Sequence, residues 1–142
     1  MWVTTAFALC LAAAAAVKNP PRLCELTIVA HGVSNANGVV GVLVFQSATG
    51  WPEQVSAALR QQSAPAHAGE TEITVSNLPA GEYAVVVLHD ENENQKLDRG
   101  PLGMPLEQWG MSNNPPYRLS APSFEAARFR LSKSERLDVQ MR

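Results

Sequence analysis

Apolar side chains occupy every second position in several short segments of the chain. In residues 25–33, Leu26, Ile28 and Ala30 would point to one face and the residues between them to the other, as in a half-buried β-strand. Residues 39–45 form a nearly continuous run of apolar, mostly β-branched residues, which predicts a central strand. Asn37 and Gly38 lie between the two segments, and this pair favours a hairpin turn because both positions tolerate a positive φ. We therefore expect an amino-terminal hairpin.

One segment has helical periodicity instead. Pro52 suits the first turn of a helix, and Val55, Ala58 and Leu59 follow it at helical spacing. The spacing therefore predicts a short amphipathic helix over residues 53–62, which would cover an edge or an end of the sheet.

The second half of the chain returns to alternation. Strands are expected at residues 70–75 and 84–88, the second after a Pro-x-Gly turn. The phrase L-P-x-G-x-Y-x-V over residues 78–85 resembles one in transthyretin-like and other immunoglobulin-like sandwiches, and this resemblance implies that Tyr83 anchors the start of the second strand. Residues 124–131 and 136–141 are expected to form a closing hairpin. Six or seven short strands with one short helix predict an all-β fold, namely an immunoglobulin-like or prealbumin-like β-sandwich with a long ordered loop.

The first sixteen residues have a different character. Residues 1–16 contain no charged side chain and end in an A-x-A-like site, a pattern typical of a secretory signal peptide. Lys18 and Arg22 stop the apolar stretch short of the roughly 20 residues that a membrane span needs. A buried helix is the alternative. We expect a signal peptide over residues 1–16 and a single exported domain over residues 17–142, periplasmic or extracellular, with no stable membrane span after cleavage.

Composition narrows the classes of function. With 17% charged residues and a net charge of −2, the chain is not basic enough for nucleic-acid binding, and it is not the acidic, aromatic-poor type that stays disordered. Cys10 lies in the predicted signal peptide and Cys24 begins the first predicted strand. A fold stapled by disulfides is therefore not expected, and Cys24 is expected to be a buried apolar residue rather than a redox centre.

Residues 89–122 form one long loop between predicted strands. A loop of this length in a compact domain is either functional or disordered. Half of the ten prolines lie in it, together with apolar side chains that favour an ordered loop folded over one end of the sandwich: Leu102, Met104, Leu106, Trp109 and Met111.

The loop opens with oxygen-bearing side chains at alternate positions. A calcium loop takes side-chain oxygens at positions 1, 3 and 5, a carbonyl at 7 and an acid at 9, which here are Asp90, Asn92, Asn94, Lys96 through its carbonyl, and Asp98. Gln95 stands where a glycine is preferred, and the twelfth position carries no glutamate. The alternative is an Asx-rich hairpin tip without a metal. Calcium binding is thus one of two readings of this loop.

Further loop residues favour a recognition surface. Aromatic rings offer a flat apolar face and amides bind hydroxyl or backbone groups, so a glycan, a peptide or an envelope protein would be the partner. Two simpler roles stay open, namely packing of the tryptophan into the sandwich and capping of backbone groups by the asparagines. The candidate ligand-binding residues are Glu107, Trp109, Ser112, Asn113 and Asn114.

Two other functional classes stay open as alternatives. His89 beside Asp90 would be the general base of a hydrolase, with Ser112 or Ser123 as the nucleophile. No G-x-S-x-G motif accompanies them, and a histidine bonded to the loop backbone is the simpler interpretation. The third class is a purely structural envelope protein. We expect a non-enzymatic exported binding protein.

The loop also carries three motifs that resemble domain-of-unknown-function family 2141. These are H-D-x-N-x-N-x-x-L-D over residues 89–98, L-G-x-P-x-E-x-W-G-x-S-N-N over 102–114 and P-x-F over 122–124. Gln95 departs from the glycine found in many members. The resemblance implies an exported bacterial domain with an immunoglobulin-like fold, and it implies no known activity.

Overall fold

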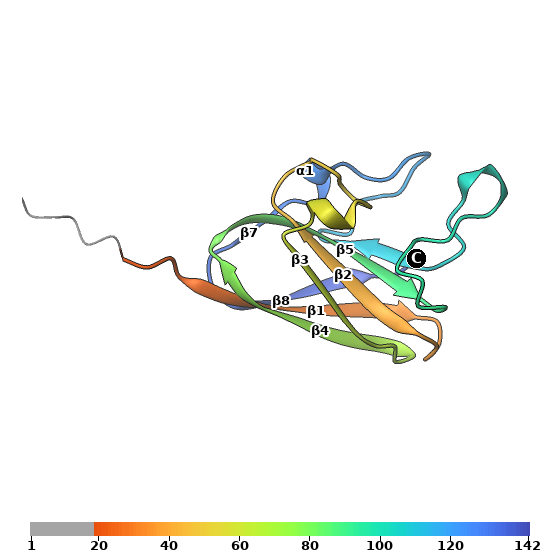
Figure 1. Ribbon diagram of the computed structural model, residues 1–142, viewed down its shortest axis with the longest axis horizontal. Coiled ribbons are helices and arrows are strands. Elements are labelled where there is room, and N and C mark those ends of the chain that lie inside the picture. Colours follow the sequence, from red (N-terminus) through yellow and green to blue (C-terminus); the bar gives the residue numbers. More distant parts are fainter. Residues whose placement is uncertain (1–18) are drawn as a thin grey trace, which may run out of the picture.

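The computed structural model describes residues 19–142, so the predicted signal peptide lies outside the described residues. Two β-sheets face each other, which confirms the all-β sandwich (Figure 1). The strands are β1 (Leu23–Val33), β2 (Val39–Phe45), β3 (Arg60–Pro65), β4 (Gly69–Pro79), β5 (Gly81–Asp90), β6 (Trp109–Met111), β7 (Phe129–Leu131) and β8 (Glu135–Gln140). Short helical turns are η1 (Val55–Ala57), η2 (Pro101–Gly103) and α1 (Phe124–Ala127). Among the described residues, no helix is long and apolar enough to cross a membrane.

The sheets have the strand orders β4-β1-β8 and β3-β2-β5-β6. In the first sheet β1 is antiparallel to β4 and parallel to β8. In the second sheet β5 pairs with β2 along most of its length, with β7 at its start and with β6 towards its end. The alternation predicted for β1 is confirmed, because Leu26, Ile28 and Ala30 are fully buried between the sheets. Tyr83 anchors β5 as expected, since its hydroxyl donates to the Pro79 carbonyl at 2.6 Å.

Both predicted hairpins are wrong. β1 and β2 lie in different sheets, and Gly38, with φ 64°, turns the chain from one layer to the other. Similarly, β7 pairs with β5 whereas β8 pairs with β1. A turn motif in the sequence determines only that the chain reverses its direction. In both cases the two strands lie in opposite sheets, so their apolar faces meet across the core instead of lying side by side in one sheet.

The predicted helix over residues 53–62 is also wrong. Only η1 is helical there, and β3 begins at Arg60. The Leu59 amide donates to the Val44 carbonyl at 2.7 Å, and the following residues pair with β2 in antiparallel register. Pairing with the edge of β2 satisfies backbone groups along the whole segment, which outweighs the weak helical preference of a ten-residue stretch. Conversely, the predicted strand over 124–131 starts with α1 and is extended only from Phe129.

A second apolar cluster covers part of the outer face of the five-stranded sheet. Trp51 contacts Phe45 and Phe124 edge-to-face, with ring centroids 5.3 and 5.9 Å apart. The buried part of this cluster is completed by Ala84, Trp109, Met111 and Ala127. The candidate site lies beside the cluster on the same sheet face, and Trp109 and Met111 belong to both.

His31 joins the three strands of the smaller sheet. Its Nδ1 lies 2.9 Å from Glu70 on β4, and its Nε2 lies 2.7 Å from Asp138 on β8. The hydrogen bond to Asp138 raises the pKa of His31 above 6.5, with the charge of Glu70 adding to the effect against partial desolvation. A pKa that is higher in the folded than in the unfolded chain adds stability at low pH, and this stability is lost as the pH rises through the folded pKa.

We expect the free energy of unfolding to fall as the pH rises above about 6.5, the ordinary pKa of histidine, because His31 of the folded chain loses its proton only in this higher range. The loss should be absent in His31→Gln and retained in His67→Gln, which removes an exposed histidine from the β3–β4 connection. Urea denaturation at a series of pH values measures it. Equal pH profiles for wild type and His31→Gln would contradict the assignment.

Candidate binding cleft and its polar loop

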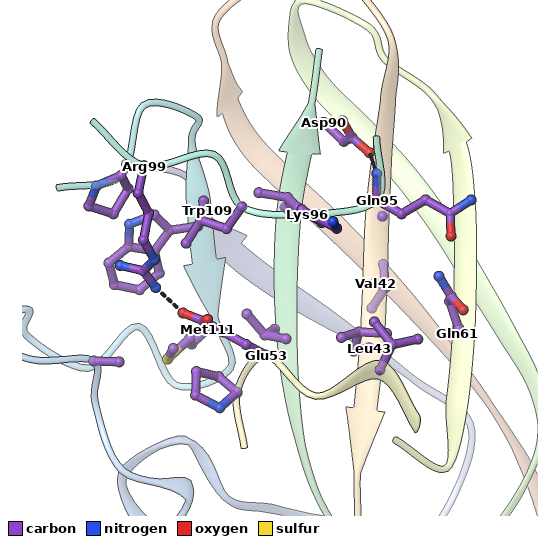
Figure 2. A pocket seen from close by; sticks show the side chains of 18 of the residues that line it. Val42, Leu43, Glu53, Gln61, Asp90, Gln95, Lys96, Arg99, Trp109 and Met111 are labelled. Atoms are coloured by element: carbon purple, nitrogen blue, oxygen red, sulfur yellow. Dashed lines mark hydrogen bonds and ion pairs between the residues drawn. The ribbon is translucent and has the colours of Figure 1, made fainter. Parts of the chain in front are cut away.

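A cleft of about 880 Å³ lies on the outer face of the five-stranded sheet (Figure 2). This volume falls within the range of roughly 300–1,000 Å³ typical of small-molecule sites. Two segments wall the cleft, which we call the first arm (residues 93–105) and the second arm (residues 117–121). Pro52, Glu53 and Val55 close a third side, and β3 borders the cleft with polar side chains.

The floor of the cleft comes from the outward positions of β2, β5 and β6. Leu43 lies opposite Val86, and Gly41 lies opposite Leu88, in the antiparallel register of β2 and β5. These outward side chains are apolar although the inward positions of both strands already fill the core. Gly41 leaves room, because a Cβ atom built there meets nothing within 4 Å. The sheet therefore has apolar surface on both faces, and the outer one is open at the cleft.

Exposed apolar side chains gather at this cleft. Seven large apolar side chains in the described part of the chain are exposed, and the five that line the cleft are Val55, Leu102, Met104, Tyr117 and Leu119. Leu102 and Leu119 are fully exposed, at 101% and 104%. An apolar surface concentrated in one place on a protein marks a binding site.

Charged groups of the first arm reach the cleft as well. Arg99 pairs with Glu53 and so ties the first arm to the segment before η1 (Figure 2). The aliphatic part of Lys96 lies over the floor, and no ion pair of its ammonium occurs among residues 19–142. The arm thus contributes one arginine that is neutralised by Glu53 and two charged side chains, Lys96 and Glu93, without an ion pair in the described part of the chain.

The predicted calcium loop leads into the first arm. Asp90 is 3% exposed, and its two carboxylate oxygens accept the amides of Asn94 and Gln95 at 3.1 and 2.6 Å. The side-chain amides of Asn92 and Asn94 donate to Asp98 at 2.6 and 2.8 Å. The four predicted side chains therefore belong to one hydrogen-bond network, and each carboxylate oxygen already has an N–H partner.

The backbone of this loop has the shape that its spacing predicts. Gln95 has φ 61°, so it adopts the left-handed conformation for which a glycine is preferred at this position. Within residues 19–142, no three His, Cys, Asp or Glu side chains converge closely enough to hold a metal ion. A cation in this loop would therefore depend on the oxygens of Asn92 and Asn94 and the Lys96 carbonyl, in addition to Asp90 and Asp98.

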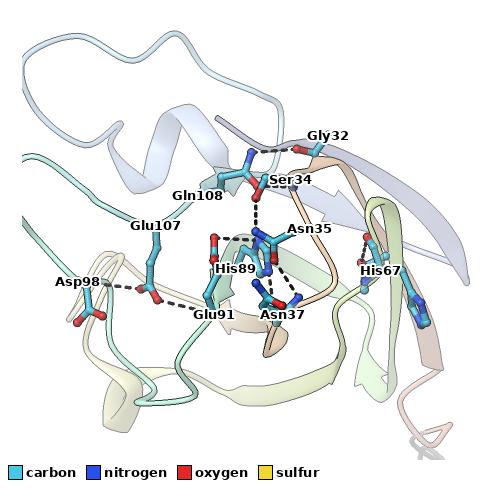
Figure 3. A network of polar contacts seen from close by, with 11 residues as sticks. Gly32, Ser34, Asn35, Asn37, His67, His89, Glu91, Asp98, Glu107 and Gln108 are labelled. Carbon is cyan, nitrogen blue, oxygen red and sulfur yellow. Dashed lines mark hydrogen bonds and ion pairs between the residues drawn. The ribbon is translucent and has the colours of Figure 1, made fainter.

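Glu107 closes the loop from behind instead of lining the cleft. Its carboxylate accepts the amides of Glu91 and Asp98 at 3.2 and 3.1 Å (Figure 3). Desolvation by burial raises the pKa of Glu107, and the charges of Asp98 and Asp90 add to this increase. Glu107 thus clamps both ends of the segment between Glu91 and Asp98.

The hydrolase residues are not brought together around a nucleophile. His89 is fully buried, and its Nε2 donates to the Asn37 carbonyl at 2.8 Å (Figure 3). Ser112 lies opposite Val85, four residues from His89 along β5, which is about 13 Å at the rise of a β-strand. Ser123 caps α1 by accepting the Ala126 amide. The His89 Nδ1 atom has no hydrogen-bond partner and lies 4.0 Å from Glu91.

Like Glu107, three further predicted ligand-binding residues bind the protein's own backbone. Ser112 is buried and donates to the Ala127 carbonyl at 2.5 Å. The Asn113 amide donates to the Arg128 carbonyl at 2.7 Å, and Asn114 accepts the Gln140 amide at 2.7 Å. These contacts hold the end of β6 against the segments that follow it.

Trp109 is the one predicted ligand-binding residue that lines the cleft. It is 7% exposed and packs edge-to-face against Tyr117, with ring centroids 5.2 Å apart. The Arg142 guanidinium lies 5.3 Å from the centroid of the same indole ring. Trp109 therefore supports the second arm through Tyr117, and the exposed contact surface comes from the arms themselves.

A family model described as an uncharacterized protein conserved in bacteria (DUF2141) matches residues 28–139, which include all of the cleft. No curated protein and no solved structure matches the chain.

Proposed function

The chain belongs to the DUF2141 family of bacterial proteins, and we propose that it is an exported, non-enzymatic binding protein whose cleft receives a largely apolar ligand. Export is supported by the uncharged, apolar residues 1–16. Binding without catalysis is supported by the lining of the cleft, which includes neither histidine nor cysteine. The observation that carries the proposal is the gathering of exposed apolar side chains at the cleft.

Burial of these side chains supplies the driving force. Removing a leucine or methionine side chain from water contributes about 1.5–3 kcal/mol. Leu102 and Met104 are on the first arm, Leu119 is on the second, and all three line the cleft. One ligand between the arms would therefore bury several of them. Loss of ligand freedom offsets part of this gain. The free energy gained by burying these apolar side chains is therefore sufficient for binding without a polar contact.

We expect an uncharged fluorescent probe, N-phenyl-1-naphthylamine, to bind in the cleft. Gly41→Leu places a branched side chain on the floor where a Cβ meets no neighbour, so it should fill the cleft without straining the sheet. The substitution should lower the affinity for the probe at least about tenfold, equivalent to about 1.4 kcal/mol of binding free energy. Fluorescence titration measures this, with circular dichroism to verify folding.

The matched control is Thr74→Leu. It adds the same side chain at an exposed strand position of β4, in the other sheet. Thr74→Leu should bind the probe like wild type. Probe affinity that is unchanged in Gly41→Leu, or equally reduced in both variants, would rule out the cleft as the binding site.

We also propose that residues 90–98 bind Ca²⁺ weakly, with a dissociation constant of about 10⁻⁴–10⁻³ M. The hydrogen bonds that join Asn92 and Asn94 to Asp98, and the Asn94 amide to Asp90, support this proposal. Because the same segment leads into the first arm, a bound ion would stiffen one wall of the cleft.

Calcium at about ten times its dissociation constant should stabilise the folded chain by about 1.4 kcal/mol. For a domain of this size the melting temperature should then rise by roughly 3–6 °C. Asp98→Asn should abolish most of the rise, whereas Glu93→Gln, which removes an acid of the same loop that is not a predicted ligand, should retain it. Thermal unfolding after EDTA treatment measures the shift, and an unchanged melting temperature in wild type would leave the loop as a metal-free hairpin tip.

A further inference from the structure

We infer that the ligand of the cleft is a single-chain amphiphile with an anionic head, and that the Lys96 ammonium is the counter-charge of that head. The inference rests on the proposed function of the cleft. It adds the chemical class of the ligand and the residue that selects it.

The charged side chains that line the cleft differ in whether they already have an ion pair or a hydrogen bond within the protein. Arg99 and Glu53 neutralise each other, and Asp90 accepts two backbone amides. Lys96 and Glu93 are the lining charges whose side chains have neither an ion pair nor a hydrogen bond in the described part of the chain. Lys96 lies across the apolar floor, above β5 (Figure 2). A ligand that lies on this floor therefore meets a cation that has no partner among the described residues.

The position of Lys96 suits a ligand with an apolar chain and an acidic end. The methylene stem of a lysine packs along apolar groups while its ammonium stays at the edge. A chain lying on Leu43, Val86 and Leu88 would cover this stem and exclude water from the ammonium. Exclusion of water strengthens the attraction of the ammonium for an anion, and it disfavours a ligand that leaves the ammonium unpaired.

The shape of the cleft favours a free amphiphile over a bilayer. The lining residues come from four sides, namely the two arms, β3 and the segment before η1, around a volume of about 880 Å³. Such an enclosure has room for one chain and offers no flat face to a bilayer. We therefore assign the site to a dispersed amphiphile of the fatty-acid type.

The experiment compares ligands with the same chain and different heads. Dodecanoate and dodecyltrimethylammonium, each below its critical micelle concentration, are titrated by calorimetry against the wild-type protein. Dodecanoate should bind at least about tenfold more tightly, as expected for one charge-assisted hydrogen bond. Lys96→Met, which keeps the length of the stem, should lose this preference. Lys133→Met, an exposed lysine before β8, is the matched control and should keep the preference.

The outcomes separate this inference from the proposed function. Equal affinity for both heads, or a preference that survives in Lys96→Met, would overturn the role of Lys96 and leave the cleft as an apolar site. Failure of dodecanoate and of the uncharged probe to bind would overturn both. If the protein sediments with phosphatidylglycerol vesicles and dodecanoate does not compete, the ligand would be a membrane surface instead of a free amphiphile.

Discussion

Gly110→Ala is expected to destabilise the protein by about 3 kcal/mol, near the upper end of the effects of overpacking a core. Gly110 lies in the middle of β6, where the strand passes directly over β8. A Cβ atom at this position would lie 2.6 Å from Val139 Cγ1 and 2.7 Å from the Gln140 carbonyl oxygen. Val139 is fully buried, and the second neighbour is backbone, so neither can move away without opening the sandwich.

The contact matters because β6 joins the two sheets at this point. Trp109 and Arg142 exchange two backbone hydrogen bonds of 3.1 and 3.0 Å, which attach the carboxyl-terminal end of the chain to the five-stranded sheet. Separating β6 from β8 would strain this pair and the floor of the cleft beneath Trp109. Urea denaturation measures the change in stability. The matched control is Gly41→Ala, where the added methyl meets nothing within 4 Å, and a Gly110→Ala protein as stable as Gly41→Ala would contradict the packing described for β6.

Gly38→Ala is the second substitution expected to have a large effect, again about 3 kcal/mol or more. Gly38 has φ 64°, and left-handed backbone costs an alanine about 1–2 kcal/mol. In addition, a Cβ atom there would lie 2.1 Å from the Asp90 carbonyl oxygen and 2.8 Å from the Glu91 carbonyl carbon. The turn between the sheets therefore presses against the first residues of the polar loop.

Gly69→Ala separates the two contributions. Gly69 has φ 88°, but a Cβ atom there meets nothing within 4 Å, so this variant has the backbone strain without the clash. Gly38→Ala should lose clearly more stability than Gly69→Ala in urea denaturation. It should also lose the response of the melting temperature to calcium, because the clash displaces Asp90. Equal losses in the two variants would mean that the turn does not contact the loop.

Most of the strands could be predicted from the sequence, but β3, β6 and the partners of the predicted strands could not. Alternation identified the buried face of β1 and the buried run of β2, because burial follows the two-residue period of a strand. The turn at Gly38 correctly reverses the chain, yet the strands on either side enter different sheets. Partner choice depends on how both layers fill the core, and no short segment contains that information. The helix predicted over residues 53–62 is wrong for the same reason, since the free edge of β2 offers the backbone of this segment more hydrogen bonds.

The candidate site was predictable only in part. The proline-rich and Asx-rich composition of residues 89–122 identified the loop, and the spacing of Asp90 and Asp98 identified its turn. The cleft was missed because it forms between this loop and the outer face of β2 and β5, two surfaces that meet only in three dimensions. One signal was present in the sequence. Val39, Leu43, Val86 and Leu88 are apolar at positions that face away from the core, as expected of a sheet covered on both faces.

The binding of an apolar ligand in the cleft is tested most directly by nuclear magnetic resonance. The ¹⁵N-labelled protein is titrated with dodecanoate while the backbone amide shifts are recorded. Saturable shifts should map to Gly41, Leu43, Leu88 and the two arms, and should leave the outer face of β4 unchanged. Shifts that never saturate, or that map to the three-stranded sheet instead, would contradict the cleft as the site of function.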